Sequence, residues 1–193
     1  VLRYLFLDEW PGRAVRDASY KIIEAMKEWN LSQARAAANE YREIVKQERD
    51  KTIETIGILK DWSSQKEVKG DSFELDYNQA AEMIGVTKET IRGWERNRLV
   101  AIPRKGPGRV RCFTTHVCQR LQVIYLLRQA QFSLSAIYTA LKSLDKGDDA
   151  SAMESLEAPE KDLVFTSGDH VLEVLNETLD KAGDLIKFLD PLT

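Results

Sequence analysis

Two short amphipathic patterns joined by one glycine, within residues 77–97, constrain the fold of this chain more than any other feature. Asp76 begins a capping box, and apolar residues at helical spacing follow it. Gly85 ends this first pattern, and Thr87 is a suitable N-cap for a second helix that we expect to reach Asn97. Two short helices around a tight turn predict a helix-turn-helix.

The second of these helices carries a stripe of positive charge. Lys88, Arg92 and Arg96 recur every four residues and therefore share one ridge of the helix. Ile91 and Trp94 lie on another face, which is suited to a core. Three long cations on one ridge match a groove lined with phosphates.

A glycine- and proline-rich segment, PRKGPGRVRCF at residues 103–113, follows this helix. Its two Gly and two Pro bend the backbone, its four cations project, and residues 110–113 can pair as a short strand, so we expect a wing. Residues 87–128 contain ten Lys or Arg against two Glu, whereas residues 129–193 contain five Lys against thirteen Asp or Glu. This segregation favours a polyanion as partner over an evenly solvated charged surface.

Helical periodicity also organises the rest of the chain. We expect helices at residues 15–29, 31–62, 115–129 and 133–144. The sequence thus predicts a mainly α fold with a winged helix-turn-helix domain. Its expected parts are an N-terminal helical region at residues 1–62, a linker at 63–73, the winged-helix domain at 74–144, an acidic connector at 145–166 and a C-terminal helix at 167–193.

The C-terminal helix has an apolar seam whose positions alternate by three and four residues over nearly three heptads. So short a seam is not stable alone and needs a partner helix. We expect this seam to dimerise the protein through Leu172, Leu175, Leu179, Ala182, Ile186 and Leu189.

Residues 75–144 resemble the winged-helix head of the MerR (mercury-resistance regulator) family of bacterial transcription factors. Many residues of the family pattern occur in the right order over this span. The resemblance is therefore more specific than one based on a lone helix-turn-helix pattern. These residues are Ala81, Gly85-Val86, T-I-R-x-W-E at residues 90–95, Leu99, Arg104, Arg111-x-Phe113, and Phe132-Ser133-Leu134 with Ile137.

This resemblance implies a homodimer that is joined by an antiparallel coiled coil and binds a two-fold operator. It further implies bending and untwisting of promoter DNA for RNA polymerase, in the bacterial cytoplasm at the nucleoid, without a cofactor. With the cationic stripe and wing, it predicts contacts with double-stranded DNA from Lys88, Thr90, Arg92, Trp94, Arg96, Arg104, Lys105, Arg109, Arg111 and Phe113.

Two positions depart from the family pattern. Gly93 replaces a Tyr, which removes a phosphate contact and weakens the helix by about 1 kcal/mol relative to Ala. Arg98 replaces a helix-ending Gly, so we expect Asn97 to take the left-handed conformation.

The N-terminal helices are not a usual part of such a head. IIEAMKEW at residues 22–29 resembles IYTALKSL at residues 137–144, and a long helix follows each copy. One interpretation is a degenerate repeat, in which residues 1–62 are the back half of a second unit. The alternative is a helical hairpin that packs on the dimer.

Other classes of function have weaker support. The chain has no glycine-rich phosphate loop or HExxH, and its two histidines lack a nucleophile-base setting, so we expect no enzyme. The spacing of Cys112, His116 and Cys118 does not match structural zinc, so we expect no metal. Neither a bilayer span nor a signal peptide is apparent, which favours the cytoplasm.

Two questions stay open at the level of sequence. An architectural, chromosome-anchoring DNA-binding protein with helical protein-interaction regions is the alternative to a regulator. A small-molecule effector is not identified. Four aromatic residues can line a pocket among the helices, although a core position is commoner for such residues: Trp10, Trp29, Tyr41 and Trp62.

Overall fold

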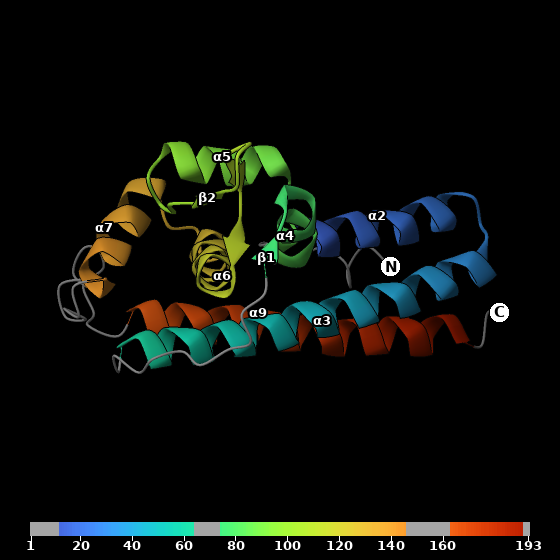
Figure 1. Ribbon diagram of the computed structural model, residues 1–193. Helices are drawn as coiled ribbons and strands as arrows, with labels where there is room; N and C mark the ends of the chain where they lie inside the picture. Colours follow the sequence, from blue (N-terminus) through green and yellow to red (C-terminus); the bar gives the residue numbers. More distant parts are fainter. Residues whose placement is uncertain (1–11, 64–73, 146–162, 191–193) are drawn as a thin grey trace. The chain divides into compact units, whose positions relative to one another are not determined.

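The computed structural model describes residues 12–63, 74–145 and 163–190 of the chain, and these residues are mainly helical (Figure 1). They divide into two units, one made of residues 1–53 with 169–193 and the other of residues 54–168. The predicted linker and acidic connector lie largely outside the described residues. None of the described helices combines the length and apolarity of a membrane span.

The first unit is a helical assembly. It contains α2 (Arg13–Lys27), the beginning of α3 (Leu31–Ser63) and the end of α9 (Leu163–Leu189). Asn30 caps α3, since its side-chain oxygen accepts a hydrogen bond of 3.0 Å from the backbone N–H of Gln33. The helix α3 then continues for 33 residues, because it has no Pro and its only Gly is Gly57.

The end of α2 differs from the prediction. The helix was expected to reach Trp29, but α2 ends at Lys27 and Trp29 is 82 % exposed. The backbone N–H of Asn30 donates to the carbonyl of Ala25, and that of Trp29 donates to Met26. These two bonds form a Schellman motif, in which Trp29 takes the left-handed conformation (φ 54) and its side chain turns outward.

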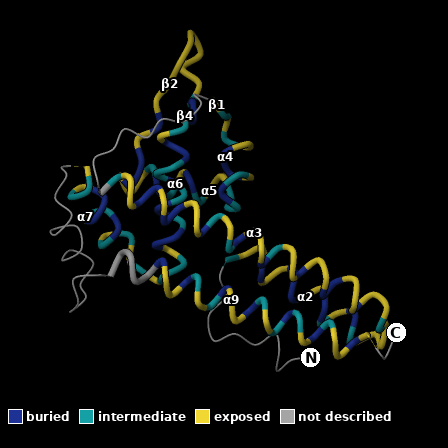
Figure 2. The backbone as a smooth tube through the Cα atoms, turned by 90° about the horizontal axis from the view of Figure 1, so that it is seen from below, coloured by how far each residue is buried: buried dark blue, intermediate teal, exposed yellow. Residues whose placement is uncertain are grey.

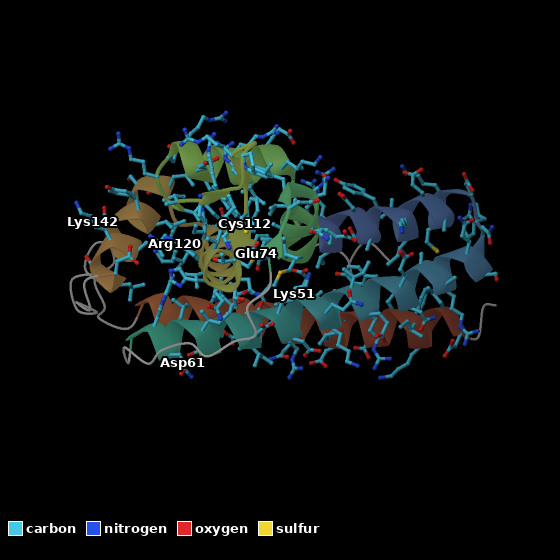
Figure 3. All side chains as sticks on the ribbon, viewed as in Figure 1. Lys51, Asp61, Glu74, Cys112, Arg120 and Lys142 are labelled. Carbon is cyan, nitrogen blue, oxygen red and sulfur yellow. The ribbon has the colours of Figure 1, made fainter. Side chains whose placement is uncertain are left out.

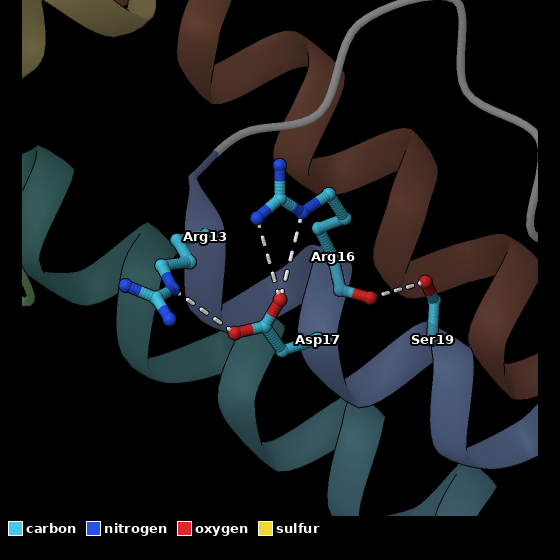
Figure 4. A network of polar contacts seen from close by, with 4 residues as sticks. All are labelled: Arg13, Arg16, Asp17 and Ser19. Atoms are coloured by element: carbon cyan, nitrogen blue, oxygen red, sulfur yellow. Dashed lines mark hydrogen bonds and ion pairs between the residues drawn. The ribbon is translucent and has the colours of Figure 1, made fainter.

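Burial and polar contacts divide α2 into two faces. Val15, Ile22 and Ala25 are buried, and the buried Ser19 satisfies its hydroxyl by donating to the carbonyl of Arg16 at 2.6 Å. Asp17 lies on the exposed side, where it pairs with Arg16 and with a second arginine one turn earlier (Figure 4). Exposed pairs of this kind contribute little stability, so burial is what holds α2 in place.

The inward face of α9 is rotated relative to the predicted seam. Figure 2 shows buried segments alternating with more exposed ones along this helix. Leu175, Ala182 and Leu189 are buried, as a seam requires. The other three seam positions, Leu172, Leu179 and Ile186, are only half-buried. The buried stripe of α9 consists of Val171, Leu175, Thr178, Ala182, Leu185 and Leu189.

The second unit contains the helix-turn-helix and its wing. The helices are α4 (Tyr77–Ile84), α5 (Lys88–Arg96), α6 (Thr115–Gln129) and α7 (Leu134–Leu144). Two antiparallel pairs of short strands accompany them. One joins β1 (Glu74–Leu75) to β4 (Phe113–Thr114), and the other joins β2 (Arg104–Lys105) to β3 (Val110–Arg111).

The predicted helix starts are confirmed in this unit. Asp76 accepts hydrogen bonds from the backbone N–H groups of Asn78 and Gln79, and the Gln79 side chain accepts one from the Asp76 N–H, which completes the capping box. Thr87 and Ser133 cap α5 and α7 in the same way. Local sequence signals therefore determine where these helices begin.

The helix α6 is buried on more than one side. Val117, Leu121 and Ile124 face the core. Cys118, Val123, Leu126 and Leu127 are also buried, because α6 contacts α4 and α7 and because Gly168, near the start of α9, lies close to Leu126. The apolar residues of α6 therefore do not form a single stripe.

Candidate nucleic-acid interface

The stripe of cations on α5 is exposed, as the sequence predicts. Lys88, Arg92 and Arg96 all project into solvent, whereas Ile91 is fully buried and Trp94 is 5 % exposed. The helix therefore has one apolar face in the core and one cationic face outside. Figure 3 shows nitrogen-bearing side chains projecting from the outer side of α5.

The wing is a two-stranded hairpin. Arg104 pairs with Arg111, and Lys105 pairs with Val110. The turn between the strands contains Gly106 (φ 72) and Arg109 (φ 48), both left-handed. Because every residue from Pro103 to Val110 is exposed, the cations of the wing project into solvent.

Four polar side chains connect α4, α5 and the wing. Glu95 accepts hydrogen bonds from the hydroxyl of Tyr77 and from Nε of Arg111, each at 2.9 Å. The guanidinium groups of Arg92 and Arg111 lie 5.4 and 5.8 Å from the centre of the Tyr77 ring. This Tyr77 cluster orients one arginine of the recognition helix and one of the wing against a common ring.

The Tyr77 cluster also holds its charges in place. Burial alone would raise the pKa of Glu95, but hydrogen bonds from Arg111 and Tyr77 outweigh it, and the pKa lies below its ordinary value. The hydrogen bond to Glu95 raises the pKa of Arg111. Burial and the same carboxylate raise the pKa of Tyr77. Glu95 is therefore ionised and Tyr77 neutral at physiological pH.

The predicted cations differ in their partners. Arg92 pairs with Glu89 at 3.2 Å, Arg111 pairs with Glu95 at 2.9 Å, and Lys105 pairs with Glu74. Within the described parts of the chain, the remaining predicted cations form no ion pair, and all are exposed: Lys88, Arg96, Arg104 and Arg109. These four are available to phosphates without breaking an internal contact.

Two aromatic residues predicted to contact DNA are buried instead. Trp94 is 5 % exposed and Phe113 is fully buried, and Phe113 packs edge-on against Tyr77 at 4.8 Å. They support the surface from the core, because the inward face of α5 and the strand β4 place them there. Thr90 is half-buried, and its hydroxyl lies 2.9 Å from that of Thr87 at the N-cap.

The helix end after α5 also differs from the prediction. Asn97 has φ −81, and the left-handed residue is Arg98 (φ 60). The N–H of Arg98 donates to Glu95 and that of Leu99 to Trp94, which is again a Schellman motif. The predicted conformation is thus displaced by one residue, and it leaves Arg98 exposed beside the recognition helix.

Sequence reasoning missed the residues that position others. No role was predicted for Tyr77, and Glu95 entered only as part of the T-I-R-x-W-E motif at residues 90–95. Their roles depend on contacts between elements far apart in the chain, which periodicity does not report. An acidic residue within a basic stripe is the one local signal for Glu95.

Arg120 of α6 connects several elements of the second unit (Figure 3). Its Nε donates to the carbonyl of Leu99 at 2.6 Å, and it forms a two-point pair with Asp145 at 2.7 and 3.1 Å. Its guanidinium lies over the ring of Trp62, and this ring also meets His116 edge-on. Trp62 therefore packs on the outer side of α6.

The other aromatic residues considered for an effector have different surroundings. Trp29 is exposed, Tyr41 is fully buried, and Trp10 lies outside the described residues. A groove of about 460 Å³ between α2 and α3 is lined by Tyr20, Ala36 and Ala37 with acidic neighbours, and none of the three candidate aromatics that the structure describes lines it.

The cysteines are packed in the domain. Both are buried, and burial raises the pKa of Cys112, with a further rise from Glu74, and that of Cys118 to about 11. Both are therefore protonated thiols at neutral pH. In the described part of the chain, no group of three or more His, Cys, Asp or Glu residues is placed to hold a metal ion.

A capped helix-turn-helix with a cationic recognition helix and a cationic wing defines a winged-helix DNA-binding domain. Residues 76–144 match the model of the MerR HTH family regulatory protein, so this domain is similar to the helix-turn-helix head of that family. No curated protein and no solved structure matches the chain.

Proposed function

We propose that this chain is a sequence-specific transcription regulator of the MerR type, which binds promoter DNA and distorts it. One observation carries the proposal. Lys88, Arg96, Arg104 and Arg109 are exposed and form no ion pair with the described residues, and they lie on the recognition helix and wing of a MerR-type head. The helix and the wing are the two elements with which a winged helix contacts a duplex.

The two elements have different tasks in this proposal. The helix α5 enters the major groove, where a guanidinium can donate two hydrogen bonds to a guanine, and Arg92 is the side chain best oriented for this role. The wing contacts phosphates, which fixes register without reading sequence. Arg111 is held by Glu95, so it arrives at the duplex already ordered.

Distortion of promoter DNA supplies the regulatory step. Bending a site of 20–30 base pairs costs about 1–6 kcal/mol, which contacts from two heads can offset. The resemblance implies that a homodimer distorts the promoter. RNA polymerase is then the partner that binds the realigned promoter elements. Such a regulator acts where bacterial DNA is, at the nucleoid in the cytoplasm, and the proposal needs no enzymatic step, cofactor or effector.

Competition binding tests the proposal. A palindrome from upstream of the gene and a random duplex of equal length compete for the protein at about 150 mM salt. We expect the palindrome to bind on the order of a thousandfold more tightly, because base contacts and deformability add to the phosphate term. A ratio near one refutes sequence-specific regulation and favours the architectural, chromosome-anchoring alternative.

Transcription from the same promoter gives the second measurement. Purified RNA polymerase with and without the protein should yield different amounts of transcript. Arg92→Ala should remove this difference, whereas Lys46→Ala, which changes an exposed cation of α3, should leave it intact. A protein that binds the palindrome tightly but leaves transcription unchanged is not a regulator of that promoter.

A further inference from the structure

The two long helices of this chain have matching buried stripes. In α3 the stripe alternates by four and three residues over Ala34, Ala38, Tyr41, Val45, Glu48, Thr52, Thr55 and Leu59. In α9 it alternates in the same way over Val171, Leu175, Thr178, Ala182, Leu185 and Leu189. Buried positions at this spacing are those of a coiled coil.

Three contacts give the direction of pairing. Arg35 forms an ion pair of 2.6 Å with Asp190, and further along α3 the Nε of Arg49 donates to Asn176 at 2.8 Å. Still further along, in the second unit, Ile56 lies directly against Gly168. As the chain advances along α3, its partner moves back along α9, so the helices pair in antiparallel fashion.

A short helix precedes each long one, and the two short helices bury equivalent residues. Ile22 and Ala25 are buried in α2, and Ile137 and Ala140 are buried at the same spacing in α7. The exposed Lys27 and Lys142 also correspond. The first unit holds α2, the beginning of α3 and the end of α9. Besides the helix-turn-helix and α6, the second unit holds α7, the beginning of α9 and the end of α3. This arrangement is the one expected of a duplicated helix pair that folds on its own copy.

We infer that α3 is the partner of α9 within one chain, so that the protein is a single-chain pseudo-dimer of a duplicated helix pair. The seam on α9 is then closed by the chain's own first copy rather than by a second molecule. This inference revises the assembly expected from the resemblance, because a homodimer through this seam would have to separate α3 from α9.

The burial of α9 within a single chain supports closure. Leu175, Leu185 and Leu189 are fully buried, and Ala182 is 1 % exposed. A second copy of α9 can reach these residues only by replacing α3. The half-buried Leu172, Leu179 and Ile186 form a separate ridge, which is the surface left for any contact between two closed chains.

Polar residues occur in both stripes. Glu48 and Thr52 are buried in α3, and Thr178 is buried in α9. Each is satisfied within its own helix, because Thr52 donates to the carbonyl of Glu48, Thr178 donates to that of Val174, and Glu48 pairs with Lys51. These residues can therefore be buried without a polar partner on the other helix.

The consequence for DNA rests on the proposed function. The described residues contain one helix-turn-helix for two paired long helices, so this part of a closed chain presents one reading head. One head covers one half-site, and a two-fold operator recruits two closed chains rather than two chains that share α9.

Crosslinking tests the closure directly. Arg49→Cys and Asn176→Cys are combined in a chain where Cys112 and Cys118 are replaced by Ala, and a short bis-maleimide bridges the two new thiols. We expect a product with the mass of one chain, 22.0 kDa, in which mass spectrometry finds a peptide of α3 joined to a peptide of α9. The yield should approach completion at low protein concentration.

The controls separate the alternatives. Asn176→Cys alone should give no product, and a product of twice the chain mass would show that α9 pairs with another α9, which overturns the inference. A doubled mass that requires both cysteines shows exchange of α9 between chains and overturns it as well. Light scattering of the unmodified protein at one chain mass supports closure without any substitution that could impair folding.

Two outcomes distinguish this inference from the proposed function. If the intrachain bridge forms but no duplex is bound, the inference stands and the regulator proposal fails. If the palindrome is bound but bridges form only between chains, the regulator proposal stands and the closed chain is refuted. Protection of one half-site by the bridged chain at low concentration is the result expected when both hold.

Discussion

Gly168 provides the sharpest test of the packing in the second unit. A Cβ added there would lie 2.8 and 2.9 Å from Cγ1 and Cδ1 of Ile56, and 3.9 Å from Cδ2 of Leu126. A contact below 3 Å requires a shift, and the β-branched Ile56 has essentially one χ1 rotamer available within a helix. Gly168→Ala therefore forces either α3 or α9 to move.

The expected size of the effect follows from two opposing terms. Ala is favoured over Gly by about 1 kcal/mol in a helix interior, whereas overpacking costs about 1–3 kcal/mol. Gly168→Ala should therefore leave stability unchanged or lower it by up to about 2 kcal/mol. At about 2–4 °C per kcal/mol for a chain of this length, Tm should fall by as much as about 8 °C.

Another glycine of the same helix is the matched control. A Cβ at Gly183 would meet no heavy atom within 4 Å, so Gly183→Ala should raise stability by about 1 kcal/mol. Thermal and urea unfolding followed by circular dichroism measure both variants. The gap between them, about 1–3 kcal/mol, isolates the cost of the contact with Ile56.

A double-mutant cycle identifies the partner. Ile56→Ala removes the atoms that the new methyl group would meet, so Gly168→Ala should become stabilising in that background. If Gly168→Ala stabilises the original protein as much as Gly183→Ala does, the close approach of α9 to α3 is wrong. The pairing inferred for the two helices would then lose its contact in this unit.

Three further predictions concern single side chains. Arg92→Ala should cut affinity for the palindrome by about 1–3 kcal/mol with little change in Tm, while Lys46→Ala changes neither in titrations on the duplex. Glu95→Gln should make acid unfolding less steep, because the lowered pKa of Glu95 gives stability that is present above its unfolded pKa and is lost as pH falls through the folded pKa; identical acid profiles would contradict this. Tyr41→Phe should raise the urea midpoint, since the Tyr41 hydroxyl is buried and has no hydrogen-bond partner among the described residues, and burial raises its pKa to about 12; a loss above about 1 kcal/mol would show an overlooked partner.

Local chemistry made the DNA-binding head predictable. The capping residues Asp76, Thr87 and Ser133 act within three residues of themselves, so their signals are complete in the sequence. The charge of α5 and of the wing is likewise a property of consecutive residues. The cationic face was therefore correctly placed, and the family match over residues 76–144 agrees with it.

Packing between elements and backbone hydrogen bonds at helix ends each made some predictions wrong. Trp94 and Phe113 were expected on the DNA surface, but the packing of α5 and β4 buries them. The exposed Trp29 and the left-handed Arg98 result from Schellman hydrogen bonds, in which backbone geometry overrides the preference for glycine. A single sequence does not show how much strain the surrounding structure will tolerate.

The C-terminal helix α9 separates what the sequence alone determines from what only the tertiary structure determines. The sequence by itself determined that α9 has a coiled-coil repeat and needs a partner, since apolar spacing is readable from one chain. Two adjacent stripes satisfy that spacing, however, and they share Leu175, Ala182 and Leu189. Only the tertiary structure decided that Val171, Thr178 and Leu185 complete the buried stripe, because the choice depends on where α2 and α3 lie, and a helical period carries no information about the position of its partner.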